Sequence, residues 1–140
     1  MKAPSSTHAP AESDCIFCQL NNTELNKIFS QNETCYARLD NFPAAHGHLE
    51  IVPKRHVVSF FDLQPNEVND VFRLMSDARK KLSQEYEPDG YTIGVNEGEA
   101  AGRTVHHLHI HLIPRYAGDV ADPRGGVRNV IPGCSPDLWS

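Results

Sequence analysis

Three histidines alternate with apolar residues near the carboxyl end of the chain, at His107, His109 and His111. Alternation with Leu108 and Ile110 predicts a half-buried strand whose imidazoles share one face, because successive side chains of a strand point to opposite faces. With a rise of about 3.3 Å per residue, neighbours on that face lie roughly 6.6 Å apart, so the rings could surround one phosphate or one metal. The run therefore predicts a histidine-lined wall beside a cleft.

The first chemistry that these residues could carry is phosphorus chemistry. A neutral imidazole is a competent nucleophile towards phosphorus near pH 7. His109, at the centre of the run, is best placed to attack, and His111 can donate a hydrogen bond to a phosphate oxygen. Thr104 offers a hydroxyl at the entry to the strand, and Arg103 could clamp phosphate through its guanidinium. His48, which a glycine turn delivers to the start of another expected strand, is a candidate partner for the triad.

Metal chemistry is the competing interpretation. Zinc sites often take two histidines from one strand, so the three triad imidazoles with a water would make a catalytic Lewis acid. Separately, Cys15 and Cys18 form a C-x-x-C pair, which supplies half of a tetrahedral cage. His56 and His107 are candidate donors for the other half. By itself, a lone C-x-x-C pair is a weak indication of zinc.

The elements that would position these residues follow in a simple order. Short apolar segments on either side of residues 31–33 predict a hairpin, and a further strand is expected at 49–52, ended by Pro53. Pro65 suits the first turn of a long helix. The expected core stripe of that helix consists of Val68, Val71, Phe72, Met75 and Leu82. With a strand at 91–96 and one through the triad, this order predicts an α+β domain with an antiparallel sheet covered on one face by helix.

The two ends of the chain differ in composition from its middle. Residues 1–13 contain Pro, Ser and Ala with almost nothing to bury, which predicts a disordered N-terminal extension. From Asp14 we expect a knuckle around the cysteine pair, leading into a short helix within 19–25. Beyond about residue 115 the chain is rich in Gly, Pro and Arg, which predicts an irregular tail on a single domain spanning 14–140.

Composition limits the class of protein. A chain of 140 residues fits one domain, and its net charge of -5 argues against a non-specific nucleic-acid binder, which needs a basic face. No apolar run is long enough to span a bilayer, and the amino terminus lacks the layout of a secretory signal. Four cysteines do not make a disulfide framework in such a chain, so Cys35 and Cys134 are expected to be ordinary thiols. We therefore expect a cytosolic protein that binds neither a membrane nor a nucleic-acid polymer.

The run from Gly102 to Arg115 resembles the signature of the histidine-triad (HIT) family, in which the alternating histidines follow a Gly-Gln-Ser/Thr-Val lead. Further segments similar to those of bacterial members are Cys15-Ile-Phe-Cys18, Leu39-Asp40 with Pro43, Gly47-His48, Val52-Pro-Lys-Arg-His56, Asp89-Gly-Tyr91, Asn96-Glu-Gly98 and Gly125-Gly-Val-Arg128. One departure is Arg103, where the family usually has Gln. Arginine keeps a donor and adds a permanent charge, so we expect a shift in leaving-group preference towards longer polyphosphates.

This resemblance implies a nucleotide hydrolase or nucleotidyl transferase. His109 would take the nucleotidyl group from the α-phosphate of a dinucleoside polyphosphate or a nucleoside phosphoramidate, and water would then release the nucleotide. The supporting residues would be His107, His111 and His48 around the nucleophile, Thr104 and Asn96 at the phosphate or leaving group, and Asp40 at the ribose hydroxyls.

The resemblance also implies a metal and an assembly. A structural zinc would be bound by Cys15, Cys18, His56 and His107. The implied fold is a five-stranded antiparallel sheet with one long helix and a short helix, paired into a homodimer. Two other functions stay open: a zinc-dependent hydrolase that uses the triad histidines as ligands, and an adaptor that binds nucleotide without turnover.

Overall fold

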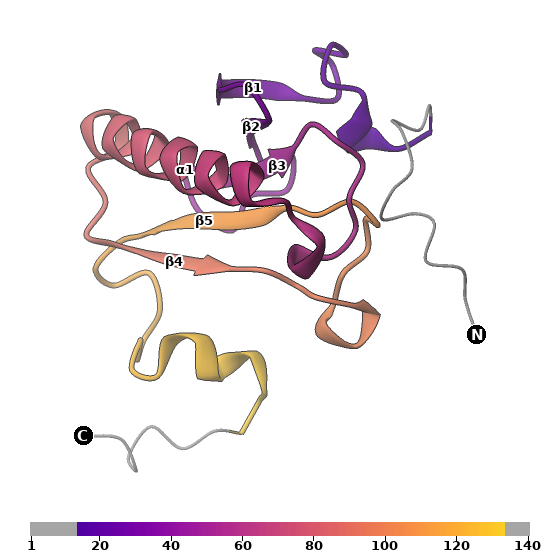
Figure 1. Cartoon of the computed structure of the whole chain (residues 1–140). Coiled ribbons are helices and arrows are strands. Elements are labelled where there is room, and N and C mark those ends of the chain that lie inside the picture. Colours follow the sequence, from indigo (N-terminus) through magenta and orange to yellow (C-terminus); the bar gives the residue numbers. More distant parts are fainter. Residues whose placement is uncertain (1–13, 134–140) are drawn as a thin grey trace.

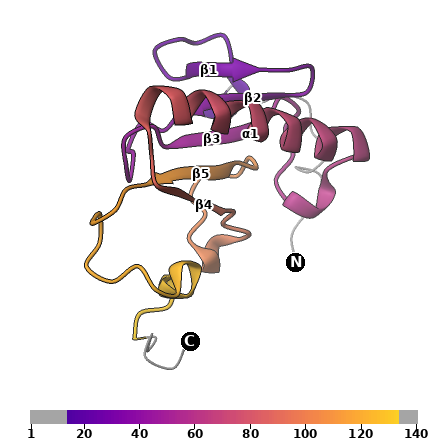
Figure 2. The same cartoon turned by 90° about the vertical axis from the view of Figure 1, so that its left-hand side faces the viewer.

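Five strands form one antiparallel sheet in the order β1-β2-β3-β5-β4 (Figure 1). The structure, a computed structural model, describes residues 14–133, so the N-terminal extension expected at 1–13 and Cys134 lie outside the described residues. Figure 2 shows one long helix, α1 (Pro65–Tyr86), lying across one face of the sheet. The expected α+β architecture, a five-stranded antiparallel sheet with one long helix, is confirmed.

The strands occur close to where alternation and turn residues predicted them. The hairpin consists of β1 (Lys27–Gln31) and β2 (Cys35–Leu39), and β3 (Leu49–Pro53) pairs with β2 in register. Along its other edge, β3 pairs with β5 (Ile110–Arg115). β5 also pairs with β4 (Gly90–Gly94). The strand order therefore places β5, which contains His111, between β3 and β4, and leaves β1 and β4 at the two edges of the sheet.

The strand through the triad starts later than its alternation predicted. Leu108, Ile110 and Leu112 are buried, as expected, but the regular ladder begins only at Ile110. The cause lies in the neighbouring strand: its last residue, Pro53, has no N–H to continue the ladder, and its carbonyl accepts a hydrogen bond from the His107 ring at 2.8 Å. The first two histidines are therefore held by side-chain contacts and not by the sheet.

Helix α1 buries a face that differs from the expected stripe. Its buried positions are Glu67, Val71, Leu74, Ala78 and Leu82. Val68 and Phe72, which the stripe included, are 49% and 72% exposed. The prediction was wrong at these two positions because the buried seam begins with a charged residue: the Glu67 carboxylate accepts hydrogen bonds from Arg55 and from the backbone N–H of Gln64, where it closes a capping box.

The knuckle at the start of the described chain is a single 3-10 turn, η2 (Ile16–Cys18). The short helix expected within 19–25 is replaced by turns, because side chains bind the backbone there. The Asn22 side chain accepts from the N–H groups of Glu24 and Leu25. The buried Asn26 amide donates to the carbonyls of Ile16 and Gln19 at 2.9 and 2.8 Å, which ties the knuckle to the start of β1.

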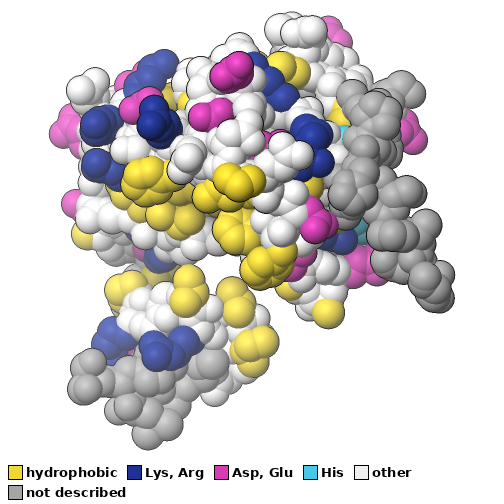
Figure 3. All heavy atoms as spheres, in the orientation of Figure 1, with side chains coloured by type: hydrophobic (Ala, Val, Ile, Leu, Met, Phe, Trp, Pro, Cys, Tyr) yellow, Lys and Arg dark blue, Asp and Glu magenta, His cyan; other side chains and the backbone are white. Residues whose placement is uncertain are grey.

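The irregular tail contains one short 3-10 segment, η5 (Gly126–Val130). Figure 3 shows this segment as a separate lobe with apolar side chains, and a hollow between it and the body of the molecule. Val127, Val130 and Ile131 are exposed on it. Within residues 14–133, no helix is both long enough and apolar enough to cross a lipid bilayer.

Candidate functional site

A cavity of about 380 Å³ opens on the face of the sheet away from α1. Six of the residues singled out from the sequence line it: Asp40, His48, Asn96, Thr104, His109 and His111. Its remaining lining comes from the knuckle, from β2 and β3, and from the loops after β2 and before β5. The fold therefore gathers, around one hollow, six predicted residues that lie up to 71 positions apart in the chain.

Hydrogen bonds fix which nitrogen of His109 faces the cavity. Its Nδ1 lies 2.8 Å from the carbonyl oxygen of His107, and because a carbonyl only accepts, Nδ1 carries the proton. In the neutral ring Nε2 then has a free lone pair. His109 is buried and lines the cavity, so it presents an unprotonated nitrogen to a ligand.

A second chain of hydrogen bonds orients His111. The backbone N–H of Ala44 donates to His48 Nδ1 at 3.0 Å, which leaves the proton of neutral His48 on Nε2. That Nε2 lies 2.9 Å from His111 Nδ1, and 3.4 Å from Asp40 Oδ2. His48 therefore donates to His111, whose own proton is on Nε2 and is available as a donor. The two triad rings in the cavity thus have opposite roles, one acceptor and one donor.

The turn that delivers His48 has little room for any residue but glycine. Gly47 has a φ of +84°, and a Cβ there would lie 3.1 Å from the side chain of Leu82 on α1. The helix thereby packs directly against the loop that aims His48. The glycine turn predicted from the sequence is present, and the close approach of α1 explains it.

Burial keeps these imidazoles neutral. It lowers the pKa of His111 to about 4, with the neighbouring His109 ring adding to the effect. It also lowers the pKa of His109, against the opposing hydrogen bond to the His107 carbonyl, and that of His48, against the opposing charge of Asp40. Near pH 7 the cavity therefore holds neutral imidazoles.

His107 has a different environment from the other two triad histidines. Its ring is fully buried beside the knuckle, where Nδ1 lies 3.4 Å from Cys15 Sγ and 3.5 Å from Cys18 Sγ. His56 Nδ1 lies 3.2 Å from Cys18 Sγ. The ring Nε2–H of His107 donates to the Pro53 carbonyl, so Nδ1 has its lone pair towards the thiols. The triad is therefore divided: two rings line the cavity, and the first belongs to a cysteine–histidine cluster.

The geometry of this cluster fits a tetrahedral metal ion. The four ligand atoms of Cys15, Cys18, His56 and His107 lie within 4.8 Å of one another. Zinc bonds of about 2.3 Å to sulfur and about 2.0 Å to nitrogen imply S···N separations of about 3.5 Å, which the measured contacts match. Donation of the other ring proton to a carbonyl, as at Pro53, is the usual arrangement behind a metal-bound histidine. Burial raises the pKa of Cys15 to about 11, so a bound cation would have to displace the thiol proton.

Arg103 is the one predicted substrate-binding residue outside the cavity lining. It follows η4 (Glu99–Ala101), and its backbone N–H donates to the Gly98 carbonyl at 3.2 Å. Its half-buried side chain has an Nε without a hydrogen-bond partner among residues 14–133. Its neighbours Gly102 and Thr104 do line the cavity, so the backbone of Arg103 lies at the rim of the cavity.

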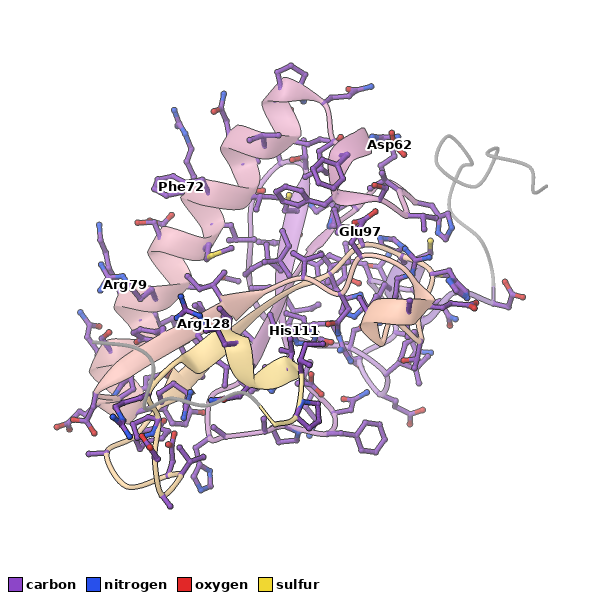
Figure 4. The ribbon with its side chains drawn as sticks, turned by 90° about the horizontal axis from the view of Figure 1, so that it is seen from below. Asp62, Phe72, Arg79, Glu97, His111 and Arg128 are labelled. Carbon is purple, nitrogen blue, oxygen red and sulfur yellow. The ribbon has the colours of Figure 1, made fainter. Side chains whose placement is uncertain are left out.

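The sequence reasoning missed a buried ion pair on the cavity floor. Arg38 on β2 and Glu50 on β3 are cross-strand partners, and their side chains form an ion pair. Glu50 is in turn opposite His111 on β5. Figure 4 shows His111 near the centre of the molecule and Phe72 pointing outward from α1. The available signal was a charge at inward-facing positions of two central strands, where apolar residues are the rule.

Comparison with known proteins gives one consistent result. The pattern of the HIT domain family matches residues 22–118. An uncharacterised 16.1 kDa HIT-like protein of Mycoplasma pneumoniae is 37% identical over 76% of this chain and 74% of its own length. An AP-4-A phosphorylase of Mycobacterium tuberculosis is 32% identical over 83% of this chain but only 60% of its own length. The crystal structure of a zinc-bound histidine triad family protein from Mycobacterium smegmatis superposes with a TM-score of 0.69 at 29% identity, covering 78% of this chain and 80% of that one.

Proposed function

Because this chain belongs to the HIT domain family, whose relatives include nucleotide-processing enzymes, we propose that it cleaves a nucleotide at the α-phosphate through a covalent nucleotidyl-histidine intermediate. The substrate class is a dinucleoside polyphosphate or a nucleoside phosphoramidate. The related proteins named for such activities are an AP-4-A phosphorylase and a bis(5'-nucleosyl)-tetraphosphatase, and this chain spans 60% and 53% of their lengths.

The proposed reaction has two displacements at phosphorus. The Nε2 lone pair of His109 forms a bond to the α-phosphorus while the bond to the leaving oxygen or nitrogen breaks, and the leaving group takes up a proton. Water then attacks the same phosphorus, the P–N bond breaks, and the nucleotide departs with His109 restored. His111 donates to a phosphate oxygen as negative charge develops, with His48 holding its proton in place. Asn96 and Thr104 contact the phosphate or the leaving group, and Asp40 accepts from the ribose hydroxyls.

One observation carries this proposal: the hydrogen bond from His109 Nδ1 to the His107 carbonyl, at 2.8 Å. It leaves an unprotonated nitrogen on a buried ring that lines the cavity. The division of the triad also favours this mechanism over a triad-bound catalytic metal, since the His107 ring lies with the thiols.

A panel of substrates tests the proposal. Turnover of diadenosine and diguanosine polyphosphates and of nucleoside phosphoramidates is measured for the wild type and for His109→Ala. We expect no turnover in the variant, with nucleotide affinity within a few-fold of wild type, because the nucleophile makes few ground-state contacts. Retained turnover in His109→Ala would exclude the covalent route. Binding without turnover in the wild type would identify a nucleotide-binding adaptor.

We propose in addition that the cysteine–histidine cluster holds a structural zinc. Two thiolates and two imidazoles would fill all four positions of a tetrahedral ion, which leaves no position for substrate. When bound, zinc would supply a cross-link between the knuckle and the sheet. The distances within Cys15, Cys18, His56 and His107 support this assignment, as does the zinc-bound relative.

We also propose that two copies of the chain pair. Support comes from the open edge of β4, where unpaired backbone groups can accept another strand, and from exposed apolar side chains at Ile93, Val127 and Val130. Sedimentation analysis should find a dimer at micromolar concentration, and Ile93→Asp should shift it towards monomer. A wild-type monomer at that concentration would exclude the pairing.

A further inference from the structure

The floor of the cavity contains a charged pair that the proposed chemistry does not use. Arg38 and Glu50 are 2% and 5% exposed, yet both line the cavity with His109. Burying two charges costs desolvation energy that their attraction often only just repays, and an apolar pair of similar size is usually as stable. Fold stability alone therefore gives little reason for this pair, and its position in the cavity points to a ligand.

Contacts on several sides hold Arg38 in place. Its Nη1 donates to Glu50, its Nη2 donates to the Leu25 carbonyl at 2.9 Å, and its guanidinium carbon lies 4.9 Å from the centre of the Phe17 ring. Held in this way, the guanidinium cannot swing out to meet a phosphate. Its effect is to position the Glu50 carboxylate.

Glu50 retains the capacity to bind a ligand. One of its oxygens lies within 4.8 Å of ring nitrogens of His109 and His111, so a nucleotide on His109 would come close to it. A carboxylate has about four acceptor positions on its two oxygens; Arg38 uses one of them, and the Asp40 carboxyl forms a side-chain hydrogen bond with Glu50 as well. Burial raises the pKa of Glu50 to about 7, against the opposing charge of Arg38, so the carboxylate form dominates above that pH. The remaining positions can accept hydrogen bonds from a ligand in the cavity.

The rest of the lining suits a flat aromatic group. Ile16, Phe17 and Phe42 contribute apolar walls beside the charged floor. Among the purines, guanine presents two adjacent donors on one edge, the N1–H and the 2-amino group, which can face the two oxygens of a carboxylate. Adenine presents a single donor beside the lone pair of N1, and that lone pair would face the same negative group.

We propose that Glu50, positioned by Arg38, contacts the base of the bound nucleotide and selects guanine over adenine. This inference rests on the proposed function in that the cavity must accept a nucleotide. A well-placed bidentate contact of this kind should give a preference of about 10- to 100-fold. Arg38 is a positioning residue, and Glu50 is the residue that determines specificity.

Direct binding measurements test the inference. Dissociation constants for GMP, IMP and AMP are measured by calorimetry with the full chain. Wild type should bind GMP about 10- to 100-fold tighter than AMP, with IMP between them because it lacks the 2-amino donor. Glu50→Gln should abolish or reverse this order, since a carboxamide offers adenine one acceptor and one donor. A structural role for Glu50 would weaken all three ligands equally.

Two further variants serve as controls. Glu67→Gln removes another buried carboxylate, one that pairs with Arg55 outside the cavity, and should leave the GMP-to-AMP ratio unchanged. If Glu50→Gln fails to fold, the apolar double variant Arg38→Leu with Glu50→Leu keeps the site free of unpaired charge and should bind the three ligands with similar affinity. A guanine preference that survives in either folded variant would overturn the inference.

The results separate this inference from the proposed reaction. Preferential GMP binding without turnover of any substrate would retain the base selectivity and remove the catalytic proposal. Turnover with equal binding of GMP and AMP to wild type would remove the selectivity alone. If neither nucleotide bound at millimolar concentration, both would be overturned.

Discussion

Removal of the proposed metal ligands Cys15 and Cys18 should detach the knuckle from the sheet. The double substitution Cys15→Ser with Cys18→Ser would free Phe17, which is buried at 3% exposure and whose burial contributes about 2 kcal/mol. It would also remove the acceptor of the buried Tyr36 hydroxyl, which donates to the Phe17 carbonyl at 2.5 Å, at a further cost of about 1–3 kcal/mol. Chain entropy regained by the freed knuckle offsets part of this loss.

We therefore expect a net loss of about 3 kcal/mol, which for a chain of this size lowers the melting temperature by about 10 °C. Scanning calorimetry and elemental analysis would be applied to protein purified without chelator. Wild type should contain one zinc per chain and the double variant none. Turnover per folded molecule should fall far less than in His109→Ala, because the His109 ring is held by a backbone carbonyl.

The matched control is Cys35→Ala, which removes a buried thiol on β2 outside the cluster and should retain the metal. Absence of zinc from the wild type would refute the reasoning. Zinc that survived the double substitution would assign the metal to the triad histidines instead.

Three other perturbations have defined outcomes. His48→Ala should lower kcat by about 10- to 100-fold with KM little changed, because His111 loses the donor that fixes its proton. The control His46→Ala changes an exposed histidine and should have no effect; equal losses in both variants would exclude the orienting role of His48. The acid limb of kcat/KM should lie below pH 6.5. The neutral rings are the active form and burial lowers the pKa values of His109 and His111, so activity is lost only as the pH falls through those lowered values. A limb at or above pH 6.5 would contradict the assignment. Arg103→Gln should reduce the preference for longer over shorter polyphosphate chains, since a permanent charge rewards each added anionic group; an unchanged kcat/KM ratio would show that Arg103 does not contact the chain.

Local patterns were sufficient to predict the sheet and most of the cavity. Alternation around His109 predicted the burial of Leu108 and Ile110, and Pro65 predicted the start of α1. The division of the triad was harder to foresee, because a period of two puts all three rings on one face and contains no information about the knuckle that covers His107. The knuckle residue Cys15, which contacts His107, lies 92 positions before it in the chain.

Charged residues at buried positions account for the other differences. A pattern that looks for apolar residues excludes Glu67, so the stripe on α1 was shifted to Val68 and Phe72. For the same reason Arg38 and Glu50 were not recognised as cavity residues, although each sits in a run of apolar neighbours. Their partners lie on adjacent strands, so only the register of β2 and β3 shows that each charge is compensated.

The central claim is that His109 forms a bond to phosphorus, and peptide mass spectrometry of a quenched reaction tests it most directly. Wild type is mixed with a guanosine or adenosine phosphoramidate, denatured within the first turnovers at neutral or alkaline pH, and digested. We predict an added nucleoside monophosphate on the peptide that contains residues 107–111, located on His109 and absent from His109→Ala. Steady turnover with no adduct, or an adduct on another residue, would contradict the account.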